Sequence, residues 1–445
     1  RQMCIRDRFG GYSHMNTNRK NILVGVLLIT FFLELWAPAT SGSTLSGANF
    51  KLIIRVAYFS MSLVILLAML ICRKTEIKAY NVFLAITPLV YFFIQKIWVF
   101  DSSSASTSTL LLCVLFALQT DEIKAESYRW IKCLIVIMSL TGIVCYLSFI
   151  FDLGLPYKQM PYYSLIKSGV WYLNYHVSYF YMNAVQVRLC GLFNEPGWFG
   201  TFLAFCLCVE DLNIRKLSNI IILIAGILTF SLAFILLIVL YFVLKNITDW
   251  RKWVWLVLLV SLYLFVLPNV HTGNEIIDSF IGRIVLTAES TQNSRTTDAF
   301  DTMFEAFLRS PDIIWGRGAG YSRSLGGGNL SIKTDIVDFG ILGVLAFYAP
   351  ILISLIYRVR KNKKAVCFLL CIGVSLYQRP WLFEASNFFL TLSAVSYLSI
   401  TDRDSASAGI IVRRWDSKKI TMNRLRKYEY VYKDMEAPVW GESTH

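Results

Sequence analysis

Residues 188–200 read Arg-Leu-Cys-Gly-Leu-Phe-Asn-Glu-Pro-Gly-Trp-Phe-Gly and join a long polar segment to an apolar run that continues to residue 211. Proline is favoured at the first position of a helix, so Pro196 marks the expected helix start. Arg188 and Glu195 place opposite charges just ahead of that helix. Charge at the edge of hydrocarbon is costly unless it binds or reacts with something. This stretch therefore marks an entry of the chain into a membrane and a candidate functional site.

The composition predicts a membrane protein. Hydrophobic residues make up 56% of the chain and charged residues 16%, and the mean hydropathy is +0.54. Soluble domains carry about 25% charged residues, and a helix needs about 20 apolar residues to cross the hydrocarbon core. We therefore expect an all-α polytopic membrane protein with about 12 transmembrane helices. The expected spans are 21–39, 50–72, 80–99, 107–120, 130–152, 197–211, 217–230, 232–247, 252–268, 334–357, 364–378 and 384–400.

Basic residues set the expected orientation of these spans. Lys and Arg concentrate in cytoplasmic segments of membrane proteins. With a cytoplasmic N-terminus, the inside segments hold groups such as Arg215-Lys216, whereas the short outside loops hold only Arg379. Both termini are therefore expected inside. The net charge of +14 is explained largely by this orientation, so no nucleic-acid partner is predicted.

We expect three regions along the chain. Residues 1–20 form a cytoplasmic N-terminal segment, in which 1–14 look like an artefact ahead of a natural start at Met15. Residues 21–400 form the membrane domain. Residues 401–445 form a basic cytoplasmic tail, whose mixture of cations and apolar residues is typical of a segment lying on anionic lipid.

Two long outside loops, 153–196 and 269–333, interrupt the membrane domain. Loops of this length are usually functional or disordered. Their many Tyr, Trp and Phe residues argue against disorder. We expect folded loops, whose aromatic side chains suit either sugar stacking or anchoring at the membrane interface.

Metal and disulfide chemistry are not predicted. Of the 10 cysteines, only Cys190 falls in an outside loop, so no outside pair is available for a disulfide. The 4 histidines show no ligand spacing, and no cluster of His, Cys and carboxylate residues is present in the sequence. We expect no metal and no cofactor.

Arginines in the outside segments are the candidates for binding an anion, because the planar guanidinium matches phosphate oxygens in two places. Arg188, Arg295 and Arg379 are the strongest of them, and the alternative is that they are solvated loop charges. The stretch Gly316-Arg317-Gly318-Ala319-Gly320 suggests a phosphate loop but lacks the Lys-Ser/Thr that completes one. Tight turns in a folded loop are the favoured explanation.

Four motifs together resemble those of bacterial O-antigen and capsule polymerases of the Wzy type. They are Arg188-x-x-Gly191-x-Phe193-x-Glu195-Pro196 before a helix, Thr229-Phe230-Ser231, Gly316-x-Gly318-x-Gly320, and Asp338-Phe339-Gly340-Ile341-Leu342-Gly343. Leu232 stands where the family often has a basic residue. The motifs cover a small part of the chain, but their order, spacing and expected outside placement agree.

The resemblance implies a GT-C-like architecture and a metal-independent, inverting glycosyltransferase at the outer face of the bacterial inner membrane. Its donor would be a growing glycan on undecaprenyl diphosphate, and its acceptor a single lipid-linked repeat unit. Membrane lipids are expected partners, and a chain-length regulator stays open as another. Arg188, Arg295 and Arg379 would stabilise charge on the departing diphosphate.

Glu195 is the candidate general base for the acceptor hydroxyl. The alternative is a structural role, in which Glu195 caps its helix or pairs with Arg188. The positive end of the helix that starts at Pro196 would add to the anion site.

Two other functions fit parts of the sequence. Related O-antigen ligases resemble one another in a catalytic His shortly before the acidic-x-Gly motif, and residues 328–333 hold none, although His271 lies earlier in the loop. A lipid-linked oligosaccharide flippase can also have twelve spans, but such transporters have short loops and charges within their helices. The sequence favours a polymerase.

Overall fold

The computed structural model describes seven stretches of the chain and the single positions 251, 254, 261 and 269. The stretches are 47–71, 76–100, 107–161, 171–182, 187–249, 298–324 and 331–402. The chain separates into two units, 1–398 and 399–445. In the second unit only residues 399–402 are described, and they are helical.

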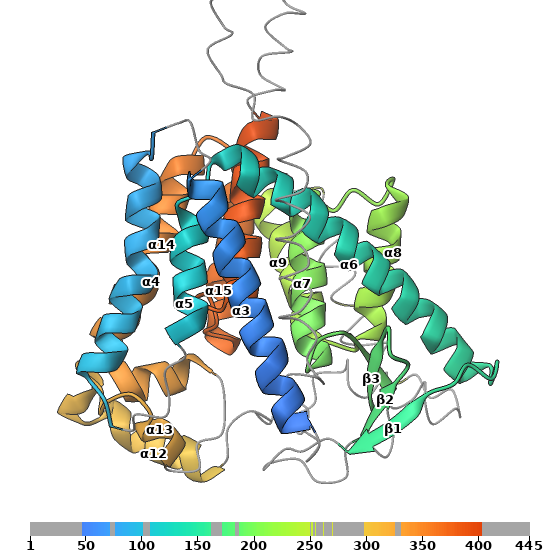
Figure 1. Ribbon diagram of the computed structural model, residues 1–445, viewed down its shortest axis with the longest axis horizontal. Helices are drawn as coiled ribbons and strands as arrows, with labels where there is room; N and C mark the ends of the chain where they lie inside the picture. The colour runs from blue at the N-terminus through green and yellow to red at the C-terminus, as the bar shows by residue number, and fades with distance from the viewer. Residues whose placement is uncertain are drawn as a thin grey trace, which may run out of the picture. The chain divides into compact units, whose positions relative to one another are not determined.

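Helices dominate the described residues (Figure 1). They are α3 (Gly47–Ile71), α4 (Ala79–Ile97), α5 (Thr107–Ala117), α6 (Asp121–Ile150), α7 (Pro196–Val209), α8 (Leu217–Leu228), α9 (Leu232–Lys245), α12 (Asp298–Leu308), η3 (Pro311–Ile313), α13 (Tyr321–Ser324), α14 (Ile332–Val359), α15 (Lys363–Gln378) and a helix over 385–398. Among the described helices, α4, α6 and α14 are long and apolar enough to cross a membrane. The chain is thus a helical membrane protein. The expected count of twelve spans stays a prediction, because 21–39 and most of 252–268 lie outside the described residues.

Helix α6 begins at Asp121, nine residues before the expected span 130–152, because its first turn is well capped. The Thr120 side chain accepts a hydrogen bond from the Ile123 amide at 3.4 Å. Asp121 and Glu122 lie in the first turn, where the helix dipole favours negative charge. A prediction from hydropathy does not find this polar first turn, because hydropathy measures only apolar character and takes no account of helix capping.

The turns expected to face the cytoplasm are joined by ion pairs. Asp211, in the turn after α7, lies 2.6 Å from Lys245 at the end of α9 and 2.9 Å from Lys364 at the start of α15. The neighbouring Glu210 binds Lys132 of α6 and Lys216 before α8. Burial makes ionisation of Glu210 more costly, but the hydrogen bonds from Lys216 and Lys132 outweigh it and lower the pKa of the carboxyl. Ion pairs therefore hold the helices together at one end of the bundle.

The prediction of an all-α chain is wrong in one detail, because the loop 153–196 contains a β-sheet. Its strands are β1 (Lys158–Pro161), β2 (Trp171–Asn174), β3 (Tyr179–Met182) and β4 (Val187–Gly191), paired antiparallel in the order β1-β2-β3-β4. Each strand has only four or five residues, too few for the alternation of apolar and polar residues to be read from the sequence. Aromatic side chains stabilise such a sheet by burial, and Tyr172 and Phe180 are fully buried.

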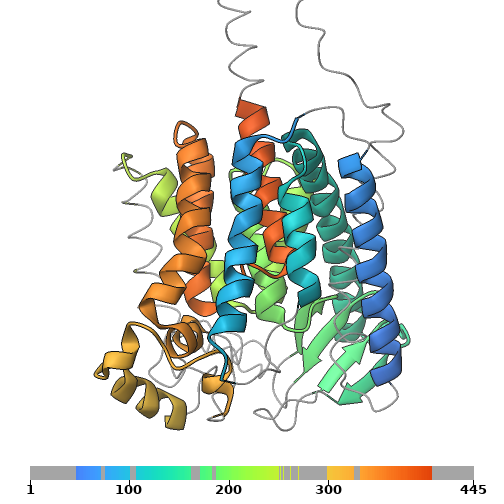
Figure 2. The same ribbon diagram turned by 60° about the vertical axis from the view of Figure 1, so that its left-hand side comes forward.

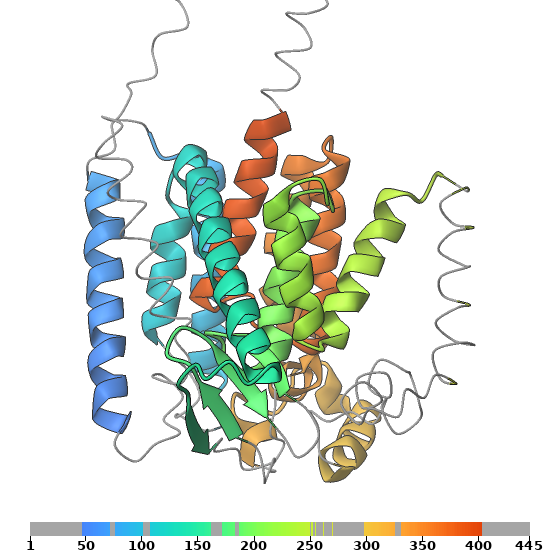
Figure 3. The same cartoon turned by 90° about the vertical axis from the view of Figure 1, so that its right-hand side faces the viewer.

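The sheet lies at the same end of the bundle as α12 and α13 (Figures 2 and 3). Strand β4 packs against α6, α7 and α8. Gly142 of α6 allows this approach, because a Cβ atom there would lie 2.7 Å from the Leu189 side chain of β4. The Tyr146 hydroxyl of α6 also donates a hydrogen bond to the Val187 carbonyl at 3.3 Å. The sheet is thus fixed on the helix ends.

Helix α14 is broken at Gly340, where the segment 314–318 packs against it. Gly340 has φ 69° and ψ 177°, a conformation open essentially only to glycine. A Cβ atom on Gly340 would collide with the carbonyl of Ile314, and one on Gly316 would lie 2.5 Å from the Asp338 carbonyl. The Gly318 and Arg317 amides donate to the carbonyls of Asp338 and Val337. Glycines on both sides therefore let two backbone segments meet closely.

We expect Gly340→Ala to destabilise the protein by about 1–3 kcal/mol from backbone strain, with the added cost of the collision. The measurement is the midpoint of thermal unfolding in detergent. Gly373→Ala in α15 is the control, because its Cβ would meet only Leu352 at 3.9 Å and alanine is favoured within helices. Equal midpoints for the two variants would contradict the packing described.

Candidate functional site

The stretch 188–200 forms the end of β4, a short turn and the start of α7. Pro196 is the first helical residue, as the sequence predicts. Glu195 takes the extended N-cap conformation, but its side chain makes no capping hydrogen bond. The Tyr172 hydroxyl of β2 donates to the Asn194 carbonyl and fixes the turn to the sheet. The capping role expected as an alternative for Glu195 is therefore not the one observed.

Glu195 forms an ion pair with Arg379. The Arg379 Nη2 lies 3.0 Å from the Glu195 Oε2, with the Arg379 side chain 4% exposed and that of Glu195 32% exposed. Arg379 follows α15, so the pair joins the start of α7 to the turn 379–384. Two of the four residues predicted for the site thus meet, 184 positions apart in the chain.

Arg188 binds the backbone between α8 and α9. Its Nε donates to the Thr229 carbonyl and its Nη2 to the Phe230 carbonyl, both at 3.1 Å. These carbonyls end α8, where the helix dipole is negative and no intrahelical donor remains. The expected alternative that Arg188 pairs with Glu195 stays a prediction, and the Glu195 carboxylate pairs with Arg379. The expected role of Arg188 in binding the diphosphate stays a prediction. Its observed role is structural, because it binds the backbone of the turn between α8 and α9.

The length of the two helices explains why this turn needs a cation. Helices α8 and α9 have 12 and 14 residues, which at 1.5 Å per residue is about 18–21 Å and less than the roughly 30 Å hydrocarbon core. Helix α8 begins and α9 ends at the charged end of the bundle, so the turn between them lies at membrane depth. Exposed backbone is tolerated there only when protein groups satisfy it. Arg188, 8% exposed, provides two such bonds.

The glycine segment 316–320 makes tight turns, as favoured from the sequence. Gly316, Gly318 and Gly320 all have positive φ. The Asp338 carboxylate accepts hydrogen bonds from the Gly320 amide at 2.9 Å and the Ser322 amide at 2.8 Å. Amides that would cradle a phosphate are thus used by a side chain of the protein. The two glycine-containing motifs form one structural joint between the second loop and α14.

Arg295 falls outside the described residues, as does His271. Their positions relative to the Arg379–Glu195 pair stay predictions.

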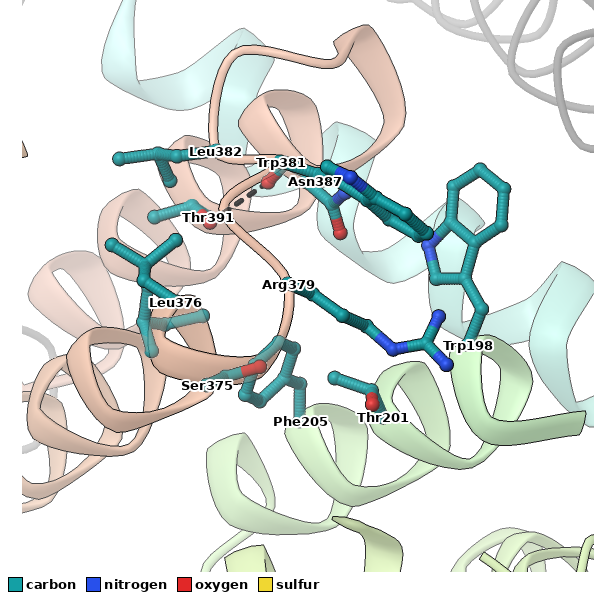
Figure 4. Close-up of a pocket in the computed structure, with 11 residues that line it drawn as sticks. Trp198, Thr201, Phe205, Ser375, Leu376, Arg379, Trp381, Leu382, Asn387 and Thr391 are labelled. Carbon is teal, nitrogen blue, oxygen red and sulfur yellow. Dashed lines mark hydrogen bonds between the residues drawn. The ribbon is translucent and has the colours of Figure 1, made fainter. Parts of the chain in front are cut away.

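A small, partly open pocket lies beside Arg379, between α7, α15 and the helix 385–398. Figure 4 shows the guanidinium extending between α7 and the turn 379–384. The rings of Trp198 and Trp381 stand at 67° with centroids 5.0 Å apart, and the Arg379 guanidinium carbon is 5.1 Å from the Trp381 ring centre. The lining residues are Trp198, Thr201, Phe205, Ile372, Ser375, Leu376, Arg379, Trp381, Leu382, Asn387 and Thr391.

The pocket combines the groups that recognise a phosphorylated sugar. A guanidinium binds phosphate, indole rings offer flat apolar faces, and hydroxyl and amide side chains such as Asn387 and Thr391 offer hydrogen bonds. The Trp198 indole N–H is buried without a hydrogen-bond partner among the described residues. A buried donor of this kind is costly until a ligand accepts from it.

Sequence reasoning missed both tryptophans, although a signal was present. Each charged residue of the pair is followed by a proline and then a tryptophan, in Glu195-Pro196-Gly197-Trp198 and in Arg379-Pro380-Trp381. Proline ends or starts a helix, so each motif places its charge and its ring at a helix terminus. Within the described ranges, no group of three His, Cys, Asp or Glu residues could hold a metal ion.

No protein-family model, no curated protein and no solved structure matches the chain. The assignment of function therefore depends on the site and on the motifs alone.

We expect Arg188→Ala to lower stability by roughly 2–4 kcal/mol, because two buried carbonyls lose a charged donor. Arg188→Lys should recover only part of this loss, since a single ammonium cannot reproduce the two bonds of the guanidinium. Thermal unfolding in detergent measures both. Wild-type stability in Arg188→Ala would show that the turn between α8 and α9 does not need the side chain.

Proposed function

We propose that the protein polymerises undecaprenyl-diphosphate-linked oligosaccharide repeat units into O-antigen or capsular polysaccharide, by inverting glycosyl transfer at the outer face of the bacterial inner membrane. The observation that carries the proposal is the buried Arg379–Glu195 pair beside a pocket with two tryptophans. The motif resemblance to Wzy-type polymerases supports it independently. The proposed orientation places the basic turns of the bundle on the cytoplasmic face and the loop that contains the β-sheet on the outer face.

Arg379 is the cation assigned to the leaving diphosphate. It is held by Glu195 and lies over the Trp381 ring, so its guanidinium is oriented before substrate arrives. Oriented donors are effective because no reorganisation is needed when charge develops. The start of α7, which is the positive end of the helix dipole, adds positive potential at the same place. The lipid-linked donor would thus place its diphosphate at the mouth of the pocket.

The two tryptophans are assigned to the sugar next to the diphosphate. Their rings meet nearly edge to face and wall the pocket on the Arg379 side. Apolar ring faces bury the C–H faces of a pyranose, and the free Trp198 N–H can bond a sugar hydroxyl. Sugar and phosphate recognition therefore share one wall.

Glu195 is assigned first to holding Arg379, because its carboxylate is bound to the guanidinium. The base role expected from the sequence stays open to test through Glu195→Gln. An amide keeps the shape and a hydrogen bond to Arg379 but cannot take a proton. If Glu195 only positions Arg379, this variant should keep a substantial part of the activity.

The direct test of the function is deletion of the gene, with gel analysis of surface polysaccharide and complementation by the intact gene. We expect products with a single repeat unit in the deletion strain and a full ladder after complementation. Loss of all repeats from the lipid core would instead indicate a ligase. Accumulation of lipid-linked units at the inner leaflet would indicate a flippase.

We expect Arg379→Lys to lower polymer formation roughly 100-fold or more, because one ammonium cannot hold Glu195 and the diphosphate together. Arg309→Lys is the matched control, since Arg309 is exposed after α12. The measurement is the length distribution of polysaccharide in the complemented deletion strain, at equal protein abundance. A normal ladder from Arg379→Lys would contradict the assignment of this residue.

A further inference from the structure

Asp335 and Tyr348 meet across the break in helix α14. The Tyr348 hydroxyl lies 2.8 Å from the Asp335 Oδ2. The two residues are 13 positions apart, which in a continuous helix at 1.5 Å per residue is about 20 Å and beyond the reach of their side chains. The non-helical conformation of Gly340 lets the first part of α14 turn back toward the second. The contact therefore depends on the kink.

The same hydroxyl also contacts the turn that carries Arg379. It lies 2.8 Å from the Pro380 carbonyl oxygen, and the Tyr348 side chain is buried. Pro380 directly follows Arg379 in the chain. The hydroxyl of Tyr348 thus lies between a carboxyl group of α14 and the backbone of the candidate site, at the ordinary O–H···O distance from both.

The number of hydrogens at this junction determines the state of the Asp335 carboxyl. Two oxygen–oxygen contacts of ordinary hydrogen-bond length need two hydrogens. The tyrosine hydroxyl supplies one, and a carbonyl oxygen supplies none. An ionised carboxylate only accepts, so it would leave one of the two contacts as an unfavourable pair of acceptors. The second hydrogen therefore belongs to Asp335, which donates to Tyr348 while Tyr348 donates to Pro380.

Asp338, three residues further along α14, is bound in the opposite way. Its two oxygens accept hydrogen bonds from the Gly320 and Ser322 amides, so its carboxylate is satisfied without a proton. The charge of Asp338 acts on Asp335, and a neighbour of the same sign makes ionisation of a second carboxyl more costly. Neighbouring carboxyl groups in different surroundings commonly divide into one charged and one neutral group.

The other titratable groups around the junction come from α4 and from the turn after α15. Tyr91 of α4 is affected by the charges of Asp335 and Asp338. Glu384, in the same turn as Arg379, also acts on Tyr91. Arg379 is the cation of this group, and it acts on Glu384. In the part of the chain that the structure describes, no ion pair joins Asp335 to a cation, which agrees with a neutral carboxyl.

We propose that Asp335 keeps its proton at neutral pH and, through Tyr348, fixes the turn that carries Arg379. Free aspartic acid is ionised above about pH 4, so the proton is retained because of the fold. Asp335 and Tyr348 are positioning residues, because neither lines the pocket beside Arg379. Their part in glycosyl transfer rests on the proposed function, whereas the protonated carboxyl does not.

Loss of this proton would open the junction. An ionised Asp335 would compete with the Pro380 carbonyl for the single tyrosine hydrogen, and hydrogen bonds to charged groups are the stronger ones. The Pro380 carbonyl would then lose its donor, and the turn would lose its connection to α14. The stability that the junction contributes is thus present while the carboxyl is protonated and is lost as the pH rises.

Infrared difference spectroscopy of the purified full-length protein in liposomes tests the protonation. We expect the wild type at neutral pH to show the carbonyl stretch of a protonated carboxyl, shifted in D2O, which Asp335→Asn lacks and which fades as the pH is raised. Asp338→Asn is the matched control and should keep this band, because Asp338 is ionised. No difference between the wild type and Asp335→Asn at neutral pH would overturn the proposal.

Thermal unfolding in detergent distinguishes the two carboxyl groups in a second way. The amide of Asp335→Asn can donate to Tyr348 as the protonated carboxyl does. We therefore expect its midpoint to be close to that of the wild type at neutral pH and above it at alkaline pH. Asp338→Asn loses an acceptor for a backbone amide and should unfold at a lower temperature at both. An equal loss in the two variants would show that Asp335 is not protonated.

Polymer formation in liposomes that contain a lipid-linked repeat unit measures the positioning role. We expect Tyr348→Phe to lower kcat roughly 10-fold or more, because a small displacement of a group that stabilises charge is costly. The wild-type rate should fall at alkaline pH, and Asp335→Asn should lose this fall. An unchanged pH profile in Asp335→Asn would overturn the positioning role. Absence of polymer from the wild type would overturn the proposed function and the positioning role with it, while the infrared band would still decide the protonation of Asp335.

Discussion

The ion pair between Arg379 and Glu195 is the contact on which the site depends. It joins two helix termini that are distant in the sequence, and it does so where the guanidinium is almost fully buried. Removing one partner of a buried pair typically costs about 3–5 kcal/mol, because the other charge is left uncompensated. The cost of burying the pair is therefore balanced only while both charges are present. A departing diphosphate would add a second anion beside the same cation.

The described parts of the two long loops, 153–196 and 269–333, support this contact. The first loop folds into a sheet whose last strand lies on α6, α7 and α8, and Arg188 in that strand bonds the turn after α8. The second loop is fastened to the broken helix α14 through glycine backbones and the Asp338 carboxylate. Tyr348 of α14 then reaches the Pro380 carbonyl, next to Arg379. The turn that carries Arg379 is thus held from two sides.

Helices, helix starts at proline and tight turns at glycine could be predicted from the sequence, because they depend on residues that are neighbours in the chain. Pro196 starts its helix as expected, and Gly316, Gly318 and Gly320 make the tight turns that their spacing predicts. The residues that the charged side chains bind could not be predicted from the sequence. Arg188 and Glu195 are close in sequence, but Glu195 binds a residue from the other end of the chain and Arg188 binds carbonyls of a helix end. The short strands of the first loop were missed for a similar reason, since pairing with a neighbour stabilises them more than their own pattern does.

We propose that one buried cation, Arg379, beside a small pocket walled by Trp198 and Trp381, serves glycosyl transfer from a lipid diphosphate. The most direct measurement is the stoichiometry of reaction in liposomes that contain only the purified protein and the lipid-linked repeat unit. The account predicts one undecaprenyl diphosphate released for each new linkage, with polymer on the remaining lipid carrier. Movement of the lipid-linked unit across the bilayer with no new linkage and no released diphosphate would contradict it.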